Sequence, residues 1–227
     1  MPTLADRLSR VRARIADAAG TAGRDPGDVT LIAVSKRRRA DEVAALNDLG
    51  QRAFGESYLQ EALDKQQALA GRPIDWHFIG PLQANKTRGV AAHFAWVHSL
   101  DRVKLARRLN DQRPDGLPPL EVCLQVNISG EASKSGVAPA ALRDLALSVA
   151  DLPRLRLRGL MAIPAPASDP GAARRPFRDL RGLAEELGEE GLVLDTLSMG
   201  MSDDLEAAVL EGATHVRVGT ALFGPRP

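Results

Sequence analysis

A lysine stands at the end of the first strongly apolar segment of the chain. The segment Val29–Ser35 has the pattern of a buried β-strand, and Lys36 follows it directly. Because side chains alternate along a strand, Ile32, Val34 and Lys36 share one face, and an ammonium group that ends an apolar face is costly to desolvate. A neutral lysine amine can attack a carbonyl carbon and form a Schiff base. Lys36 is therefore a candidate nucleophile, the alternative being a solvated lysine in a basic turn.

Three arginines, Arg37, Arg38 and Arg39, follow this lysine. Neighbouring positive charges oppose protonation of an amine, so we expect them to favour the reactive form of Lys36. A basic tract also suits contacts to nucleic acid or phosphate. The whole chain, however, has 30 Lys and Arg against 29 Asp and Glu, a net charge of +1, which is not the strong positive field of a nucleic-acid binder. Contact between Arg37–Arg39 and nucleic acid stays a further hypothesis, and it predicts that nucleic-acid binding weakens steeply with salt.

A second set of residues, nearer the C-terminus, is suited to hold an anion. The segment Leu197–Asp204 joins a predicted strand to a predicted helix, with Met201 in the turn and Ser202 as a candidate N-cap. Backbone N–H groups that converge at such a junction bind phosphate. The alternative is a capped turn in which Asp203 and Asp204 only favour the helix dipole.

The last predicted strand, His215–Val218, points to the same ligand. Alternation places Arg217 on one face with Gly219, and Thr220 follows. In a closed barrel the loops after strands seven and eight commonly hold phosphate. Strand one neighbours strand eight there, so a phosphate site beside Lys36 outlines a phosphorylated aldehyde cofactor.

These side chains depend on strands and helices that alternate along the whole chain. Runs of β-branched residues alternate with segments whose apolar residues recur every three or four positions, which is typical of βα units. The eight predicted strands are Val29–Ser35, Arg52–Gly55, Trp76–Ile79, Ala95–Ser99, Leu120–Asn127, Leu155–Ala162, Val193–Ser198 and His215–Val218. The predicted helices cover residues 3–19, 40–49, 58–69, 85–92, 102–110, 138–150, 173–188 and 203–211.

Eight such units predict an α/β fold, a single (β/α)8 TIM barrel over residues 1–227 with an extra N-terminal helix. The 227 residues fit the usual size of such barrels, from about 200 to 250. The alternative is an open doubly wound sheet, which usually has a glycine-rich turn after its first strand, whereas Ser35–Arg39 contains no glycine. We expect Ile163–Pro170 to form one long βα loop. Reactive groups of a barrel lie where strands end, which selects Lys36, Glu56, Ser57, Gly80, Ser99, Asn127, Met161, Ser198 to Ser202 and Arg217 to Thr220.

The composition argues against several other classes. Cys123 is the single cysteine, so we expect no internal disulfide and a reducing, cytoplasmic location. It lies within an apolar strand, where core packing is expected. The four histidines lack paired metal-ligand spacing, and we predict no metal. No apolar run approaches the roughly 18 to 20 residues of a membrane span, and no apolar signal segment follows the N-terminus.

A series of motifs resembles one known family. The chain is similar to the YggS/PROSC family of pyridoxal phosphate homeostasis proteins from Leu31 onward. The motifs that carry this resemblance occur in order and are Ala33-Val34-Ser35-Lys36, Phe54-Gly55-Glu56, Trp76-His77-Phe78-Ile79-Gly80-Pro81-Leu82-Gln83, Gln125-Val126-Asn127, Ser133-Lys134-Ser135-Gly136, Gly159-Leu160-Met161, Ser198-Met199-Gly200-Met201-Ser202 and Arg217-Val218-Gly219-Thr220-Ala221-Leu222-Phe223-Gly224.

The resemblance implies a barrel similar to the N-terminal domain of alanine racemases, with pyridoxal 5'-phosphate (PLP) as an internal aldimine on Lys36. It implies that Ser198, Gly219 and Thr220 hold the phosphate and that Arg217 faces the pyridine nitrogen. A permanently charged guanidinium leaves that nitrogen largely unprotonated and restrains carbanion chemistry. Ser57 and Met201 complete the expected cofactor-binding set.

The implied function is intracellular PLP, vitamin B6 and amino-acid homeostasis without an established turnover. PLP-dependent apoenzymes are possible recipients, and we expect a cytoplasmic monomer that binds neither nucleic acid nor membrane. The alternative is a PLP-dependent racemase of narrow activity. Against it, Tyr58 is the only tyrosine, and the chain ends before the β-domain that carries the second acid–base tyrosine of alanine racemases.

Two positions depart from the family pattern, and one lysine offers a second site. Arg37 to Arg39 stand where the family more usually has a Thr-Lys-Pro type of sequence, which would alter the basicity of Lys36. Ser57 replaces a common Asn and would cost one cofactor contact. Lys134 is a candidate secondary site, with a solvated loop lysine as the alternative.

Overall fold

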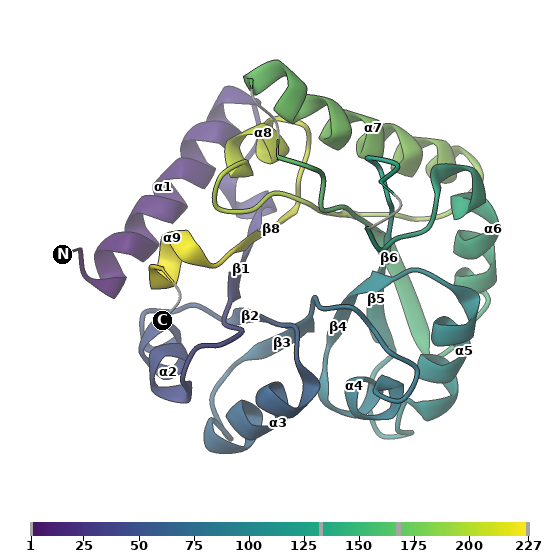
Figure 1. Cartoon of the computed structure of the whole chain (residues 1–227), viewed down its shortest axis with the longest axis horizontal. Coiled ribbons are helices and arrows are strands. Elements are labelled where there is room, and N and C mark those ends of the chain that lie inside the picture. Colours follow the sequence, from purple (N-terminus) through teal and green to yellow (C-terminus); the bar gives the residue numbers. More distant parts are fainter. Residues whose placement is uncertain (1, 132–133, 167–168, 226–227) are drawn as a thin grey trace.

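The computed structural model describes residues 2–131, 134–166 and 169–225. Eight parallel strands close into one barrel in chain order, with helices around it (Figure 1). The strands are β1 (Thr30–Val34), β2 (Ala53–Glu56), β3 (Asp75–Phe78), β4 (Trp96–Leu100), β5 (Leu120–Gln125), β6 (Leu155–Met161), β7 (Thr196–Ser198) and β8 (His215–Val218). The predicted (β/α)8 barrel is confirmed.

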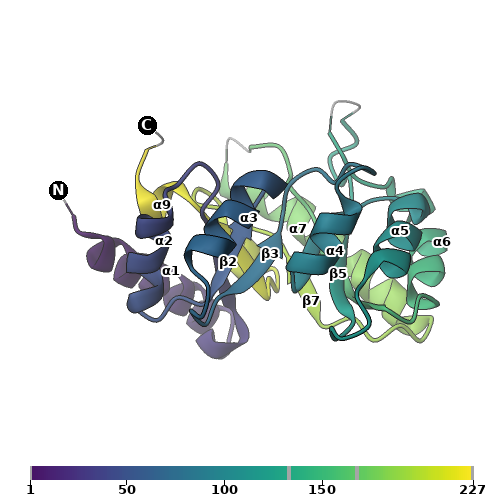
Figure 2. The same ribbon diagram turned by 90° about the horizontal axis from the view of Figure 1, so that it is seen from below.

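Helices cover the outside of the barrel, and their buried faces form most of the apolar core. In Figure 2 the loops that follow β5 and β6 extend from the upper side, where the carboxyl ends of the strands lie. The helices are α1 (Leu4–Thr21), α2 (Ala40–Asp48), α3 (Leu59–Ala68), α4 (Thr87–His93), α5 (Val103–Gln112), α6 (Pro139–Ala150), α7 (Pro170–Glu189), α8 (Leu205–Leu210) and α9 (Thr220–Phe223), with a 3-10 turn at Pro26–Asp28. None of these described helices is long and apolar enough to cross a bilayer.

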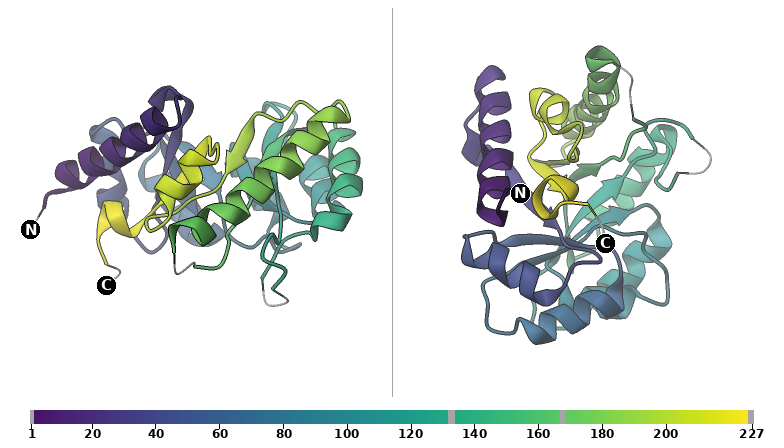
Figure 3. Two further views of the ribbon diagram at one scale, coloured as in Figure 1. Left: turned by 90° about the horizontal axis from the view of Figure 1, so that it is seen from above. Right: turned by 60° about the vertical axis from the view of Figure 1, so that its left-hand side comes forward.

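The predicted extra helix is α1, and it lies on the outside of the barrel against α2, α8 and α9. The side chain of Thr3 accepts from the backbone N–H of Asp6, and the Asp6 carboxylate accepts from the backbone N–H of Thr3. This capping box fixes the start of the helix. Helix α1 packs beside α8 and α9, as Figures 1 and 3 show. It thereby supports the two elements that flank the last strand.

Most boundaries differ by one to three residues from the sequence-based expectations, and the following differences bear on the site. Strand β7 begins at Thr196 rather than Val193, because Val193 is 87% exposed in the connection from α7. Ser202 is not the N-cap of α8, since that helix begins at Leu205 after Asp204. Helix α9 was not expected, and it turns the chain directly after β8. The long loop expected from residue 163 to 170 ends where α7 begins at residue 170, and residues 167–168 lie outside the described part.

Polar and aromatic side chains from β3, β4 and β8 meet inside the barrel. The rings of His77, Trp96, His98 and His215 lie with centroids 5.2 to 6.3 Å apart. Trp96 and His98 are two residues apart in β4, so they share one face of that strand. Cys123 is fully buried in β5, so its expected place in the core is confirmed. Among the described residues, no group of three or more His, Cys, Asp or Glu is placed to hold a metal.

Candidate functional site

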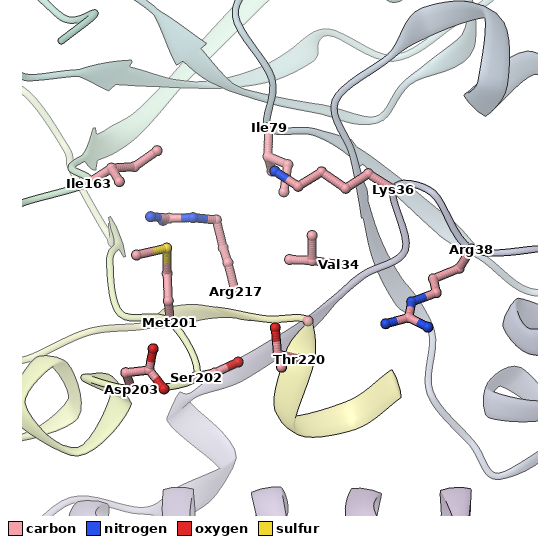
Figure 4. A pocket seen from close by; sticks show the side chains of 11 residues that line it. Val34, Lys36, Arg38, Ile79, Ile163, Met201, Ser202, Asp203, Arg217 and Thr220 are labelled. Atoms are coloured by element: carbon pink, nitrogen blue, oxygen red, sulfur yellow. The ribbon is translucent and has the colours of Figure 1, made fainter. Parts of the chain in front are cut away.

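A cavity of about 200 Å³ opens at the carboxyl ends of the strands. Figure 4 shows the side chains that enclose it, from β1, β8 and the loops after β3, β6 and β7. The lining residues are Val34, Lys36, Arg38, Ile79, Ile163, Met201, Ser202, Asp203, Arg217, Gly219 and Thr220. Five of the seven expected cofactor-binding residues are thus gathered around one cavity, namely Lys36, Met201, Arg217, Gly219 and Thr220.

Lys36 and Arg217 approach this cavity from neighbouring strands. Strand β1 pairs with β8, and Ile32 lies opposite Arg217. Lys36 is half-buried just beyond the end of β1, and in Figure 4 its side chain reaches over the cavity toward Ile79. An amine and a guanidinium therefore share a partly desolvated space, which suits an electron-rich or anionic ligand.

The turn that carries Lys36 is held from behind by a buried ionic cluster. The Lys65 ammonium, 5% exposed, donates to the backbone carbonyl of Ser35 at 2.6 Å. It also donates to Glu56 at 2.8 Å and to Glu61 at 2.6 Å. Glu61 in turn accepts from the backbone N–H of Arg37 at 2.5 Å. The peptide groups on both sides of Lys36 are thus fixed by α3.

This fixation matters because the turn is strained. Arg37 has φ 60°, a left-handed conformation that a non-glycine residue adopts at a cost. Glu56, predicted at a strand end, does not line the cavity; its carboxylate is fully buried and accepts from the Ser35 hydroxyl at 2.6 Å. Burial raises the pKa of Glu56, opposed by the Lys65 charge and the two hydrogen bonds. The burial of Lys65 was not predicted from the sequence, because lysines in helices are usually exposed to solvent.

The three arginines after Lys36 each have another partner. Arg37 lies over the ring of Tyr58, and Arg39 pairs with Asp41 at 2.6 Å. Arg38 donates to the carbonyl of Gly224 at 2.5 Å and lies over Phe223. Arg38 lines the cavity, and in Figure 4 its guanidinium lies well apart from the Lys36 amine. Arg37 and Arg39 therefore lie on the surface, while Arg38 holds the C-terminal segment beside the cavity.

Arg217 is held at the base of the cavity by neutral acceptors. It is 4% exposed, and it donates to the Ser198 hydroxyl at 2.7 Å and to the carbonyl of Ala162 at 2.9 Å. Burial lowers the pKa of Arg217 to about 10, so the guanidinium is still charged at neutral pH. The cavity thus contains a cation whose position is fixed from below.

Two expected cofactor-binding residues do not reach the cavity with their side chains. Ser198 is fully buried, and its hydroxyl accepts from Arg217 one layer below the lining. Ser57 is half-buried and is not among the lining residues. Its backbone instead closes on Gly80, where a Cβ would lie 2.4 Å from the Ser57 carbonyl oxygen.

Ser202 is the hydroxyl that sequence reasoning assigned to the wrong role. It lines the cavity beside Thr220, as Figure 4 shows, and its oxygen accepts from the backbone N–H of Ala221 at 3.3 Å. The turn before it needs Gly200, which has φ 93° and whose added Cβ would lie 2.6 Å from the Cβ of Ala208. The Ser-Met-Gly-Met-Ser motif therefore supplies two serines at two depths. Lys134, the candidate secondary site, pairs with Glu131 at 2.8 Å.

Comparison with known proteins identifies the family. The model of the alanine racemase N-terminal domain matches residues 7–227. The pyridoxal phosphate homeostasis protein of Pseudomonas aeruginosa is 61% identical over all of this chain and 97% of its own length, and that of Escherichia coli is 52% identical over all of this chain and 98% of its own.

Two solved structures have the same fold as this chain. PipY of Synechococcus elongatus with PLP bound is 37% identical with a TM-score of 0.85, covering 98% of this chain and 100% of that one. An alanine racemase of Clostridium difficile is 13% identical with a TM-score of 0.73, covering 95% of this chain and 60% of that one, and shows the shared fold. This chain belongs to the YggS/PROSC family of pyridoxal phosphate homeostasis proteins, which has the fold of the alanine racemase N-terminal domain.

Proposed function

We propose that this protein binds pyridoxal 5'-phosphate on Lys36 and serves PLP and amino-acid homeostasis without a dedicated catalytic turnover. The observation that carries the proposal is one cavity lined by the Lys36 amine, the Arg217 guanidinium and the Gly219–Thr220 backbone. PLP has one group for each of these: an aldehyde, a ring nitrogen and a phosphate. The relatives named for PLP homeostasis, and the PipY structure with PLP bound, support the same ligand.

The residues present fit this cofactor. Lys36 would form an imine with the aldehyde carbon and release one water, and Arg217 would face the ring nitrogen. The phosphate would lie at Gly219, Thr220 and Ser202, where the chain turns from β8 into α9. Ser198 takes a different part from the one implied by the resemblance, because its hydroxyl is engaged by Arg217 below the cavity.

The lining also supports a carrier rather than a racemase. Racemisation needs two acid–base groups on opposite faces of the substrate. Among the described lining residues, Lys36 supplies an amine and Asp203 a carboxylate, and Asp203 lies beside Ser202 at the proposed phosphate end (Figure 4). Tyr58 does not line the cavity and stacks on Arg37. When bound, PLP supplies an electron sink, which a charged Arg217 at the ring nitrogen weakens.

Borohydride reduction of the PLP-treated protein tests the assignment. We expect one pyridoxyl label on the peptide that contains Lys36, and none there in Lys36→Ala. Lys104→Ala, which removes an exposed lysine on α5, is the matched control and should label like the wild type. Label that is unchanged in Lys36→Ala would refute the site.

Solvent deuterium exchange at the α-carbon of a panel of amino acids tests the absence of turnover. We expect no sustained exchange above free PLP. Exchange at enzyme-like rates would replace the carrier proposal with the racemase. Light scattering tests the further proposal of a monomer, and cell fractionation tests the proposed cytoplasmic location.

A further inference from the structure

A chain of hydrogen bonds runs from the cavity into the centre of the barrel. Arg217 donates from Nη1 to Ser198 Oγ at 2.7 Å. Ser198 Oγ lies 2.8 Å from His98 Nδ1, and His98 Nε2 lies 2.9 Å from His77 Nδ1. All four side chains are at most 4% exposed. The chain links β8, β7, β4 and β3 across the barrel interior.

One arrangement of the hydrogens gives every contact in this hydrogen-bond series one donor and one acceptor. Ser198 accepts from Arg217, so its own hydrogen needs an acceptor, and His98 Nδ1 provides it. His98 must then carry its hydrogen on Nε2 and donate to His77 Nδ1. With the opposite direction, the Ser198 hydrogen would be buried without a partner, and such a group costs about 1–3 kcal/mol. The geometry therefore selects the Nε2–H form of both histidines.

The surroundings keep both rings neutral. Burial lowers the pKa of His77 to about 3 and that of His98 well below its ordinary value. The ring of Trp96 stacks on both, and its other neighbour is the Arg158 guanidinium, 5.1 Å from the ring centroid. His215 also packs against both rings. A charged His98 would therefore face positive charges, with no carboxylate in hydrogen-bond contact with its ring among the described residues.

We propose that Ser198, His98 and His77 form a positioning relay that fixes Arg217 as a donor at the base of the cavity and so sets the protonation state of the cofactor's ring nitrogen. Each member has a definite task. His77 accepts the His98 hydrogen, His98 accepts the Ser198 hydrogen, and Ser198 is thereby left with a lone pair toward Arg217. This proposal rests on the proposed function, because the ring nitrogen that the relay would act on belongs to bound PLP.

The first test needs no cofactor. In the apo protein labelled with ¹⁵N-histidine, long-range ¹H–¹⁵N spectra at neutral pH report which ring nitrogen carries the hydrogen. We expect an unprotonated Nδ1 and a protonated Nε2 for both rings, with assignments from His77→Gln and His98→Asn. A hydrogen on Nδ1 of His98, or a doubly protonated ring, would overturn the relay whether or not PLP binds.

The second test uses PLP that is labelled with ¹⁵N in its ring. His98→Leu removes the acceptor for Ser198, His98→Asn retains one at the Nδ1 position, and Ser198→Ala removes the acceptor for Arg217. We expect the ring-nitrogen shift of the bound cofactor to move in His98→Leu and Ser198→Ala, to return toward wild type in His98→Asn, and PLP to bind about tenfold more weakly in the first two. His93→Leu changes an exposed histidine on α4 and should leave the shift unchanged.

The outcomes separate the two proposals. If PLP leaves no label on Lys36 of the wild type, the proposed function fails while the histidine spectra still decide the relay. If PLP binds at Lys36 and His98→Leu and Ser198→Ala leave the ring-nitrogen shift at its wild-type value, the relay fails alone. A change in melting temperature without a change in that shift would assign these residues a structural role only, which also refutes the relay.

Discussion

Replacing Lys65 with methionine isolates the energetic role of the buried cluster behind Lys36. The substitution preserves most of the apolar volume of the side chain but removes three hydrogen bonds, to Glu56, Glu61 and the Ser35 carbonyl. Glu56 is fully buried, and one of its carboxylate oxygens, Oε2, already lacks a partner. Removing the cation from a buried ion pair leaves an uncompensated charge and costs about 3–5 kcal/mol. For a domain of this size that corresponds to a fall in melting temperature of roughly 6–20 °C.

The pH dependence of this loss has a definite sign. The pKa of Glu56 is raised by burial even with Lys65 present, and it rises further without that cation. A carboxyl group whose pKa is higher in the folded than in the unfolded state destabilises the fold above its folded pKa. The difference between Lys65→Met and wild type should therefore be largest at alkaline pH and shrink as the pH falls toward the ordinary glutamate value.

Thermal and urea unfolding of four proteins measure the effect. The double variant Lys65→Met with Glu56→Gln removes both charges, so it should recover most of the loss, since replacing both partners of a buried pair is close to neutral. Lys104→Met changes an exposed lysine and should stay within about 0.5 kcal/mol of wild type. A single variant as stable as wild type, or a double variant no better than the single one, would refute the account of this cluster.

Three further predictions concern other parts of the barrel. Gly159→Ala places a Cβ 1.8 Å from the Thr196 carbonyl oxygen and should lower the melting temperature strongly. The control Gly182→Ala, whose added Cβ has no atom within 4 Å, should raise stability by about 0.5–1 kcal/mol. An unchanged melting temperature of Gly159→Ala would contradict the close approach of the two strands. Burial lowers the pKa of His215 to about 4, so the free energy of unfolding should fall as the pH drops from about 6.5 to 4. The fall should be smaller in His215→Gln and the same as in wild type in His93→Gln. Equal pH slopes in all three proteins would refute this role of His215. Burial raises the pKa of the Cys123 thiol, so it should react with Ellman's reagent only on unfolding, and prompt reaction in buffer would contradict its place in the core.

Apolar periodicity was sufficient to predict the eight strands and their order. Several strands are apolar on both faces, and the carboxyl ends of all strands in a barrel lie at one rim, so the sequence predicts that Lys36 and Arg217 meet. Strand alternation, however, specifies the face of a residue and not its depth. Ser198 faces inward as expected, yet it lies one layer below the lining, and Ser202 takes the place at the cavity.

The parts that sequence reasoning missed depend on contacts between distant segments. Lys65 lies on the buried face of α3, but lysines are rarely buried unless paired, and its partners Glu56 and the Ser35 carbonyl come from distant segments. His77 and His98 are polar residues within otherwise apolar strands, and their two-residue alternation with neighbours such as Trp96 was the available signal of a polar interior layer. Their mutual hydrogen bond joins adjacent strands, which no single-strand pattern specifies.

The two buried cations near Lys36, Lys65 and Arg217, are compensated in opposite ways, and the difference bears on function. Lys65 contacts two carboxylates, so its charge is neutralised where it stands and serves to hold the turn. Arg217, among the described residues, donates to a hydroxyl and a carbonyl, so its charge is solvated by dipoles but not cancelled. A buried cation held by neutral oxygens costs stability that an electron-rich ligand can return. The arrangement therefore favours a fold whose stability increases on binding at the cavity, as a protein that retains its cofactor requires.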